Sequence, residues 1–144
     1  MLTPPDFPIV WAKDDRFEES RVSRVFNCRL PSRYPLAVVH ANSEKDVIDA
    51  VRIAEQLDVK ISVRSGGHSW AVWSVRDDAI LIDLDGMSSI EYEDDTEIVK
   101  VGPATTGEKL NRFLATKGRM FNGGHCPTVG LGGFLYHPLV TTLI

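Results

Sequence analysis

The sequence predicts an α/β protein built on a parallel sheet. Residues 37–40 form a short apolar run typical of a strand, and residues 60–64 form a second strand. In that second strand Ile61 and Val63 alternate with polar neighbours, so we expect them to bury one face. A helix capped by Ser43 lies between the two strands. Because short loops join strand, helix and strand, the two strands are expected to run parallel.

The segment before this unit is predicted to be less regular. Residues 1–12 carry several prolines and are expected to form an irregular lead-in. Residues 14–26 have a partial apolar stripe and predict a helix whose arginines face solvent beside neighbouring acids. Pro31 and Pro35 then exclude regular structure from the loop that leads into the first strand.

Further elements follow the second strand. Three more strands are predicted at residues 80–84, 90–93 and 97–101, the last two as a hairpin. Thr105 and Glu108 match a capping box, which opens a helix that stops at Gly118. Trp70 and Trp73 are expected to be core or wall residues.

Length, charge and cysteine usage limit the possible functions. A chain of 144 residues can form one domain with a real core. A net charge of −4 argues against a nucleic-acid or anionic-membrane partner, and no apolar run is long enough to span a bilayer. The first residues lack the pattern of a signal peptide, which favours the cytoplasm. Cys28 and Cys126 do not form a disulfide framework.

A glycine loop at the end of the second strand carries chemically useful groups. It consists of Arg64, Ser65, Gly66, Gly67, His68 and Ser69. Two glycines let the backbone approach a ligand closely, and successive N–H groups in such a turn can hold an anion such as phosphate. Arg64 has a forked cation suited to the same group. The loop lies past the carboxyl end of a parallel strand, where ligands of α/β sheets usually bind.

A second glycine loop closes the chain and carries a thiol. Its sequence is Phe121-Asn122-Gly123-Gly124-His125-Cys126-Pro127-Thr128-Val129-Gly130-Leu131-Gly132-Gly133-Phe134. Together the two loops predict a large anionic ligand held by backbone amides. His68 and Cys126 are both nucleophiles toward an electrophilic ligand.

Other interpretations of these residues stay open at this point. His68 can be an ordinary hydrogen-bonded histidine and Cys126 a small buried hydrophobe. His68, His125 and Cys126 can also be zinc ligands, although a structural zinc site needs a fourth ligand and none is near them in sequence. Neither loop has the spacing of a Walker motif or of a dinucleotide fingerprint.

The residues of both loops carry a family resemblance. The segment Arg64–Ser69 resembles the pyrophosphate loop of FAD-dependent oxidases of the vanillyl-alcohol oxidase and p-cresol methylhydroxylase type. Cys126–Gly133 resembles the second flavin loop of the berberine bridge enzyme-like subgroup, and Tyr34–Val39 resembles the family's opening strand. The resemblance implies an incomplete FAD-binding domain, opening with a βαβ unit. It implies a lead-in at residues 1–34, the partial domain at 35–134 and an atypical tail at 135–144.

The resemblance also implies how FAD is held. The implied cofactor-binding residues are Arg64, Ser65, Gly66, Gly67, His68, Ser69, Cys126, Thr128, Val129, Gly130 and Gly132. In the family the histidine at the place of His68 bonds to the 8-alpha methyl of the flavin. In the bicovalent subgroup the cysteine at the place of Cys126 bonds to the ring's 6-position. An electron-poor flavin is a suitable electrophile for a neutral imidazole or a thiolate.

By resemblance the parent reaction is an oxidation. Hydride passes from a C–H of an alcohol, sugar or other secondary metabolite to the flavin, and dioxygen then reoxidises it. Family members continue into a substrate-binding domain, whereas residues 135–144 are apolar and proline-broken and then stop. We therefore expect a truncated flavoprotein whose catalytic residues are missing, prone to association and inactive alone. The alternative is a non-catalytic nucleotide-binding or interaction fragment.

Overall fold

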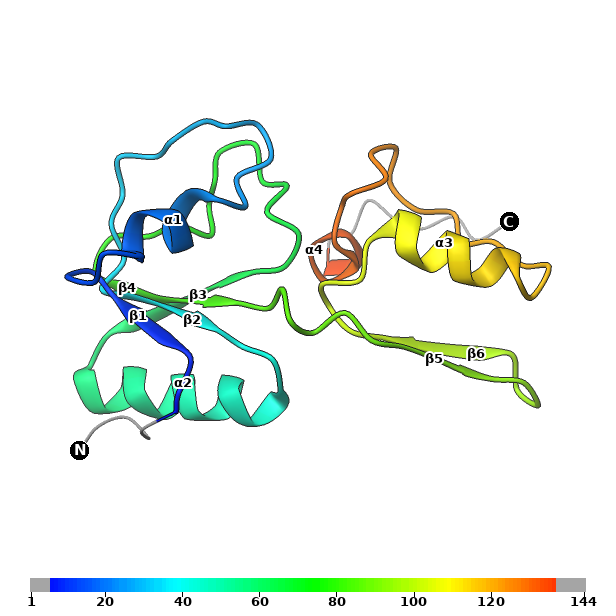
Figure 1. The fold of residues 1–144 in the computed structure, drawn as a ribbon, viewed down its shortest axis with the longest axis horizontal. Helices are drawn as coiled ribbons and strands as arrows, with labels where there is room; N and C mark the ends of the chain where they lie inside the picture. Colours follow the sequence, from blue (N-terminus) through cyan, green and yellow to red (C-terminus); the bar gives the residue numbers. More distant parts are fainter. Residues whose placement is uncertain (1–5, 137–144) are drawn as a thin grey trace.

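The computed structural model describes residues 6–136 and arranges them in two lobes (Figure 1). The first lobe is a four-stranded sheet with helices on both faces, and the second is a two-stranded sheet covered by a helix. In chain order the elements are β1 (Ile9–Trp11), α1 (Phe17–Val22), β2 (Ala37–His40), α2 (Glu44–Leu57), β3 (Lys60–Arg64), β4 (Ala79–Asp83), β5 (Ile90–Glu93), β6 (Ile98–Val101), α3 (Gly107–Ala115) and α4 (Leu131–Tyr136). The predicted α/β architecture is confirmed.

The first sheet has the strand order β1-β2-β4-β3. β4 pairs in parallel with both β2 and β3, whereas β1 pairs antiparallel with β2. The predicted parallel strand–helix–strand unit is therefore present, with β4 inserted between its two strands. As a result the carboxyl ends of β2, β3 and β4 lie on the same side of the sheet, and the first glycine loop begins there, directly after β3.

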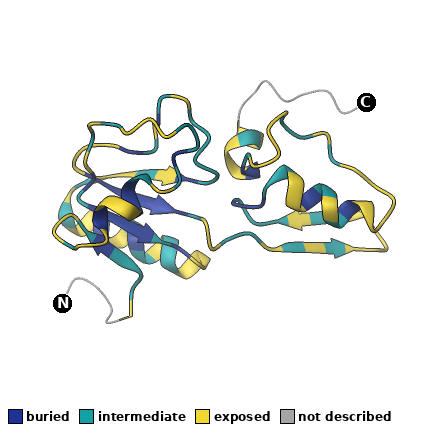
Figure 2. Ribbon diagram, turned by 45° about the horizontal axis from the view of Figure 1, so that its top comes forward, coloured by how far each residue is buried: buried dark blue, intermediate teal, exposed yellow. Residues whose placement is uncertain are grey.

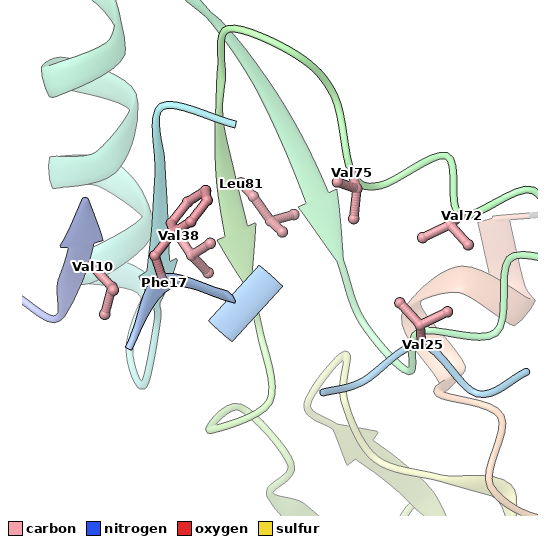
Figure 3. Close-up of a cluster of buried hydrophobic side chains, with 7 residues drawn as sticks. All are labelled: Val10, Phe17, Val25, Val38, Val72, Val75 and Leu81. Atoms are coloured by element: carbon pink, nitrogen blue, oxygen red, sulfur yellow. The ribbon is translucent and has the colours of Figure 1, made fainter. Parts of the chain in front are cut away.

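The core of the first lobe lies on both faces of β4, whose five residues are all buried. One face packs against α1 through a cluster of Val10, Phe17, Val25, Val38, Val72, Val75 and Leu81 (Figure 3). The other face packs against α2 through Val39, Ala41, Ala50, Ile53, Ala54, Ile80 and Ile82. The prediction of a buried strand at residues 80–84 is confirmed, because β4 is the strand with neighbours on both sides.

β3 is an edge strand, and this overturns one prediction. Ile61 and Val63 were expected to be buried, but they are 43% and 52% exposed. Both lie beside the β4 residues that pack against α2, but on an edge strand with no neighbour on its outer side within residues 6–136. The buried residue of this strand is instead Arg64, at its carboxyl end.

The amino-terminal segment is more ordered than the lead-in that the sequence predicts. Residues 9–11 form β1, which adds to the sheet, and α1 spans only residues 17–22 of the predicted 14–26. The expectation of solvent-facing arginines holds for Arg16, which is exposed, and is wrong for Arg21 and Arg24. Arg21 is buried and donates to the carbonyls of Pro31 and Arg33, which fastens the following loop to α1.

The second lobe is a hairpin with α3 packed against it. The predicted hairpin is confirmed by the antiparallel pairing of β5 and β6. The capping residue of α3 is Thr106 rather than the predicted Thr105, since the Thr106 hydroxyl accepts from the amide of Lys109. Thr105 is buried one position earlier, and its hydroxyl donates to the carbonyl of Ser89.

The two tryptophans after the first glycine loop are not core residues. Trp70 is 75% exposed and Trp73 is 58% exposed. The guanidinium of Arg76 lies 4.9 Å from the centroid of the Trp73 ring, so this side chain lies beneath a surface cation. Among residues 6–136 no helix is long and apolar enough to cross a membrane. Residues 137–144 of the predicted tail lie outside the described part of the chain.

Candidate functional site

The first glycine loop turns away from the carboxyl end of β3 under close backbone contact. Gly67 has a φ of +71°, and a Cβ there would overlap the carbonyl oxygen of Arg24. The amide of Phe26 also donates to the carbonyl of Gly67 at 3.4 Å. Only glycine fits at position 67, because both the positive φ and the contact exclude a side chain. The segment after α1 therefore sets the path of this loop.

The amides of this loop are available to a ligand. Within residues 6–136, no protein acceptor is found for the backbone N–H groups of Ser65, Gly66, Gly67, His68 and Ser69. The five residues are only partly buried, and the Gly66 amide lies beside the backbone of Gly130. Successive unpaired N–H groups at the end of a strand are the arrangement that binds a phosphate or pyrophosphate. The geometry thus fits the predicted anion-binding role of this loop.

The second glycine loop meets the first, backbone against backbone. A Cβ on Gly66 would overlap the amide of Gly130, and a Cβ on Gly130 would lie 2.6 Å from the amide of Gly66. The carbonyl of Pro103 joins the two loops, because it accepts from the Ser65 hydroxyl at 2.6 Å and from the Gly132 amide at 2.8 Å. Four of the predicted residues, Ser65, Gly66, Gly130 and Gly132, are therefore brought together.

His68 is held at the junction of the loops. Its Nε2 lies 3.0 Å from the hydroxyl oxygen of Thr128, so two further predicted residues are in contact. Its ring stacks on Phe26, with 4.5 Å between the centroids and 13° between the planes. Burial lowers the pKa of the His68 imidazole below its usual value, which favours the neutral form. A neutral imidazole is the nucleophilic form that the predicted role requires.

Cys126 and Val129 lie in the same loop but are placed less tightly. The amide of Val129 donates to the carbonyl of Cys126 at 3.3 Å, which makes a turn. The carbonyl of Val129 accepts from Gly107 at the start of α3. The Cys126 thiol is exposed rather than buried, which overturns the interpretation of this residue as a buried hydrophobe. Within residues 6–136 no group of three or more His, Cys, Asp or Glu side chains could hold a metal ion.

Arg64 does not take the anion-binding role that the sequence suggests. Its guanidinium donates twice to the Asp83 carboxylate, at 2.6 and 3.0 Å. It also donates to the carbonyls of Ser20 and Arg21 at 2.6 and 2.7 Å. The other oxygen of Asp83 accepts from Arg24 at 2.5 Å. Because this side chain is buried and makes four hydrogen bonds within the protein, Arg64 supports the loop from beneath and leaves the anion to the backbone amides.

Two residues of this site were missed by the sequence interpretation. Phe26 was placed only in an apolar stripe, and Arg24 was expected to face solvent. Both contact the first glycine loop from a segment about 40 residues earlier in the chain. No local pattern reports such a contact, because it depends on how α1 packs on the sheet.

Residues 35–140 match the family described as the FAD binding domain. The chain belongs to this family. It is 44% identical to the FAD-linked oxidoreductase nodO of Hypoxylon pulicicidum, covering 89% of this chain and 29% of that relative. It is 41% identical to the FAD-linked oxidoreductase janO of Penicillium janthinellum, covering 93% of this chain and 30% of that relative.

Solved structures agree with the family. The carbohydrate oxidase of Microdochium nivale superposes with a TM-score of 0.78 at 32% identity, covering 92% of this chain and 28% of that protein. The Physcomitrella patens protein BBE-like 1 superposes with a TM-score of 0.79 at 26% identity, covering 92% and 29%. The resemblance to the berberine bridge enzyme-like subgroup is confirmed, and the chain has the fold of an FAD-binding domain. It spans slightly under a third of the length of these relatives.

Proposed function

We propose that this FAD-binding domain serves an oxidase that takes hydride from a C–H bond of an alcohol, sugar or secondary metabolite and passes the electrons to dioxygen. The observation that carries the proposal is the convergence of two glycine loops beside His68. Two similar proteins are named for sugar oxidation, the carbohydrate oxidase of Microdochium nivale and the xylooligosaccharide oxidase of Thermothelomyces thermophilus. Their names support the sugar class of substrate.

The chain's own residues would hold FAD through the backbone. The amides of residues 65–69, which have no acceptor within residues 6–136, would bind the pyrophosphate and place its negative charge against backbone N–H dipoles. The loop of residues 128–132 would lie along the flavin and its linker, and Gly130 and Gly132 let this loop pack directly on Gly66 and Pro103. Bound FAD supplies a two-electron acceptor that the side chains of the protein do not offer.

Covalent attachment is the second part of the proposal. His68 would be bonded to the 8-alpha carbon of the flavin, since it is a neutral imidazole directly after the anion-binding turn. Cys126 would be a second tether at the 6-position, since its exposed thiol lies in the loop that meets the first one. Attachment would keep the cofactor in place even where few side chains contact it.

The test is the colour of the purified chain before and after acid precipitation. We expect an absorption band in the blue from bound flavin, and we expect the precipitate to stay yellow. His68→Ala should lose a tether, and mass spectrometry of the peptide containing Cys126 should find it carrying flavin mass. A colourless protein that takes up no added FAD would contradict flavin binding. A wild-type protein that releases all flavin into the acid supernatant would contradict attachment alone.

A further inference from the structure

His68 lies against two aromatic side chains that have no reacting role in the proposed attachment of flavin. Phe26 lies parallel to the imidazole at 4.5 Å between centroids. On Phe26, the ring of Trp70 packs edge-on at 5.1 Å with 88° between the planes. Stacking on one face restricts rotation of the imidazole about its side-chain bonds, because a rotated ring would lose the parallel contact. Phe26 therefore sets the plane of His68.

Phe26 is itself fixed to the loop that it serves. Its amide donates to the carbonyl of Gly67, the residue immediately before His68. Its neighbour Val25 belongs to the buried cluster between the sheet and α1. The side-chain amide of Asn27 donates to the carbonyl of Trp70 at 3.2 Å. Residues 26 and 27 are therefore hydrogen-bonded to Gly67 before His68 and to Trp70 after it. These contacts hold the backbone that carries Phe26 against the first glycine loop.

Thr128 acts on the edge of the imidazole rather than on its face. Its hydroxyl lies 3.0 Å from Nε2 and comes from the second glycine loop. A hydroxyl can accept from an N–H or donate to a lone pair, so it can bond Nε2 in either protonation state of that nitrogen. When it accepts from Nε2–H, the lone pair of the neutral ring stands on Nδ1. One nitrogen is then engaged and the other is free to react.

We propose that Phe26 and Thr128 are positioning residues for flavin attachment: Phe26 fixes the plane of the His68 ring, and Thr128 engages Nε2 so that Nδ1 is the nitrogen that forms the bond. This rests on the proposed function, since it concerns the tether at His68. Neither residue contacts the reacting carbon in the proposal. Both act by holding a nucleophile in one orientation, which raises the rate of bond formation without adding a reacting group.

The bond formation balances with dioxygen as the oxidant. A nitrogen–carbon bond forms between Nδ1 and the 8-alpha carbon, and one C–H bond of that carbon is broken. The imidazole gives up its Nε2 proton, after which the Thr128 hydroxyl can donate to the bare nitrogen. Two electrons and two protons leave in total, and dioxygen takes them to become hydrogen peroxide. The imidazole ends as a neutral alkylated ring, held by the same hydroxyl.

The experiment follows attachment and binding separately in this chain. Protein prepared without flavin is mixed with FAD in air, and samples are acid-precipitated over time to measure the rate of attachment. Flavin fluorescence measures non-covalent affinity over the first seconds. Thr128→Val keeps the shape and removes the hydroxyl, and Thr128→Ser restores it. Phe26→Leu removes the aromatic face, and Phe26→Tyr keeps it. Thr128 is exposed, so its variants are expected to fold.

We expect Thr128→Val and Phe26→Leu to slow attachment by about tenfold or more at saturating FAD, where any loss of non-covalent affinity no longer limits the rate. Thr128→Ser and Phe26→Tyr should attach flavin at close to the wild-type rate. Nuclear magnetic resonance of the isolated flavin peptide should identify Nδ1 as the bonded nitrogen.

Three results would overturn the inference. Attachment at the wild-type rate in both Thr128→Val and Phe26→Leu would remove the positioning role. A slow rate that saturating FAD restores to the wild-type value would indicate a role in binding only, and a bond at Nε2 would contradict the assignment of Thr128. If the wild type binds FAD but never attaches it, this inference fails while flavin binding stands. If it binds no FAD, the proposed function fails first.

Discussion

The two lobes differ in how firmly they hold the loop that each contributes. In the first lobe every residue of β4 is buried, and apolar clusters fill both faces of the sheet. In the second lobe no residue of β5 or β6 is buried, and the core is a single cluster around Leu110, Leu114 and Leu131 (Figure 2). A two-stranded sheet has marginal stability by itself. The first glycine loop therefore rests on a rigid sheet, and the second rests on a softer support.

The candidate site combines residues from both lobes. His68 and the amides of residues 65–69 belong to the first, better packed lobe, whereas Thr128 and Cys126 belong to the second lobe. A ligand that bridges both loops would bind the ordered state of the second lobe preferentially, and so would stabilise it. We therefore expect FAD to raise hydrogen-exchange protection more in residues 90–115 than in β4.

The largest expected effect comes from the buried carboxylate of the first lobe. Asp83→Asn leaves Arg64 buried without its counter-charge and weakens the contact to Arg24. Breaking a buried pair in this way costs about 3–5 kcal/mol, so we expect a large fall in the free energy of unfolding measured with urea. The first lobe should lose its protection against hydrogen exchange as a unit.

A surface pair in the second lobe provides the matched control. Asp94 is bonded to Lys117 at 2.6 Å and is largely exposed. Asp94→Asn is expected to cost less than about 1 kcal/mol, because water and salt screen an exposed ion pair. Equal losses in the two variants would contradict the assignment of Asp83 as a buried support for the first loop.

The next largest effect tests whether the two lobes unfold independently, because it removes a core side chain from the second lobe alone. Leu110→Ala removes a buried side chain from the small cluster of the second lobe and should cost about 2–3 kcal/mol, near the lower end for such changes, because a sparse cluster can collapse around the gap. Hydrogen exchange should show the loss in α3 and the hairpin while β4 stays protected. If the protection of β4 falls equally, the lobes unfold together and the comparison above is wrong.

A smaller loss of stability, with a large effect on the site, is expected at the contact between the loops. Gly66→Ala forces a methyl group into the backbone of Gly130, so the loops must separate, at a cost of about 1–2 kcal/mol. We expect FAD affinity to fall about tenfold or more, measured by flavin fluorescence, because both loops contact the same ligand. Gly133→Ala is the control, since nothing lies within 4 Å of a Cβ there. Retained affinity in Gly66→Ala would contradict a site shared by the two loops.

The sequence was sufficient for the elements whose signals are local. The strand at 80–84, the hairpin and the cap at Ser43 follow from apolar runs, turn residues and hydrogen bonds within a few residues, and the structure has all three. The resemblance of two motifs to a known family predicted that both loops bind FAD, but it did not predict the direct contact of Ser65 and Gly66 with Gly130. The residues themselves predicted only two anion-binding loops.

What the sequence could not predict depends on strand order and on distant packing. Ile61 and Val63 have the pattern of a half-buried strand, and they are exposed because β4 takes the inner position and leaves β3 at the edge. From the sequence Arg64 is a suitable ligand for an anion. The strand register places Asp83 next to it, and the two side chains form a buried ion pair. Phe26 contacts His68 only because α1 packs across the sheet. None of these facts has a signature in neighbouring residues.

The smallest change in stability is expected from removing two buried hydroxyl groups, of which one has a hydrogen-bond partner and the other has none in the described part of the chain. The hydroxyl of Ser62 in β3 is buried and has no hydrogen-bond partner among residues 6–136. Removing an unsatisfied buried group relieves a desolvation penalty, so Ser62→Ala should leave the free energy of unfolding unchanged or raise it by up to about 1 kcal/mol. Thr105 in the second lobe is buried too, but its hydroxyl donates to Ser89 at 3.1 Å. Thr105→Val should therefore lower stability by about 1 kcal/mol, since it leaves that carbonyl with one bond fewer. Urea midpoints of both variants measure the difference, and a clear loss of stability in Ser62→Ala would mean that its hydroxyl is satisfied by an ordered water molecule.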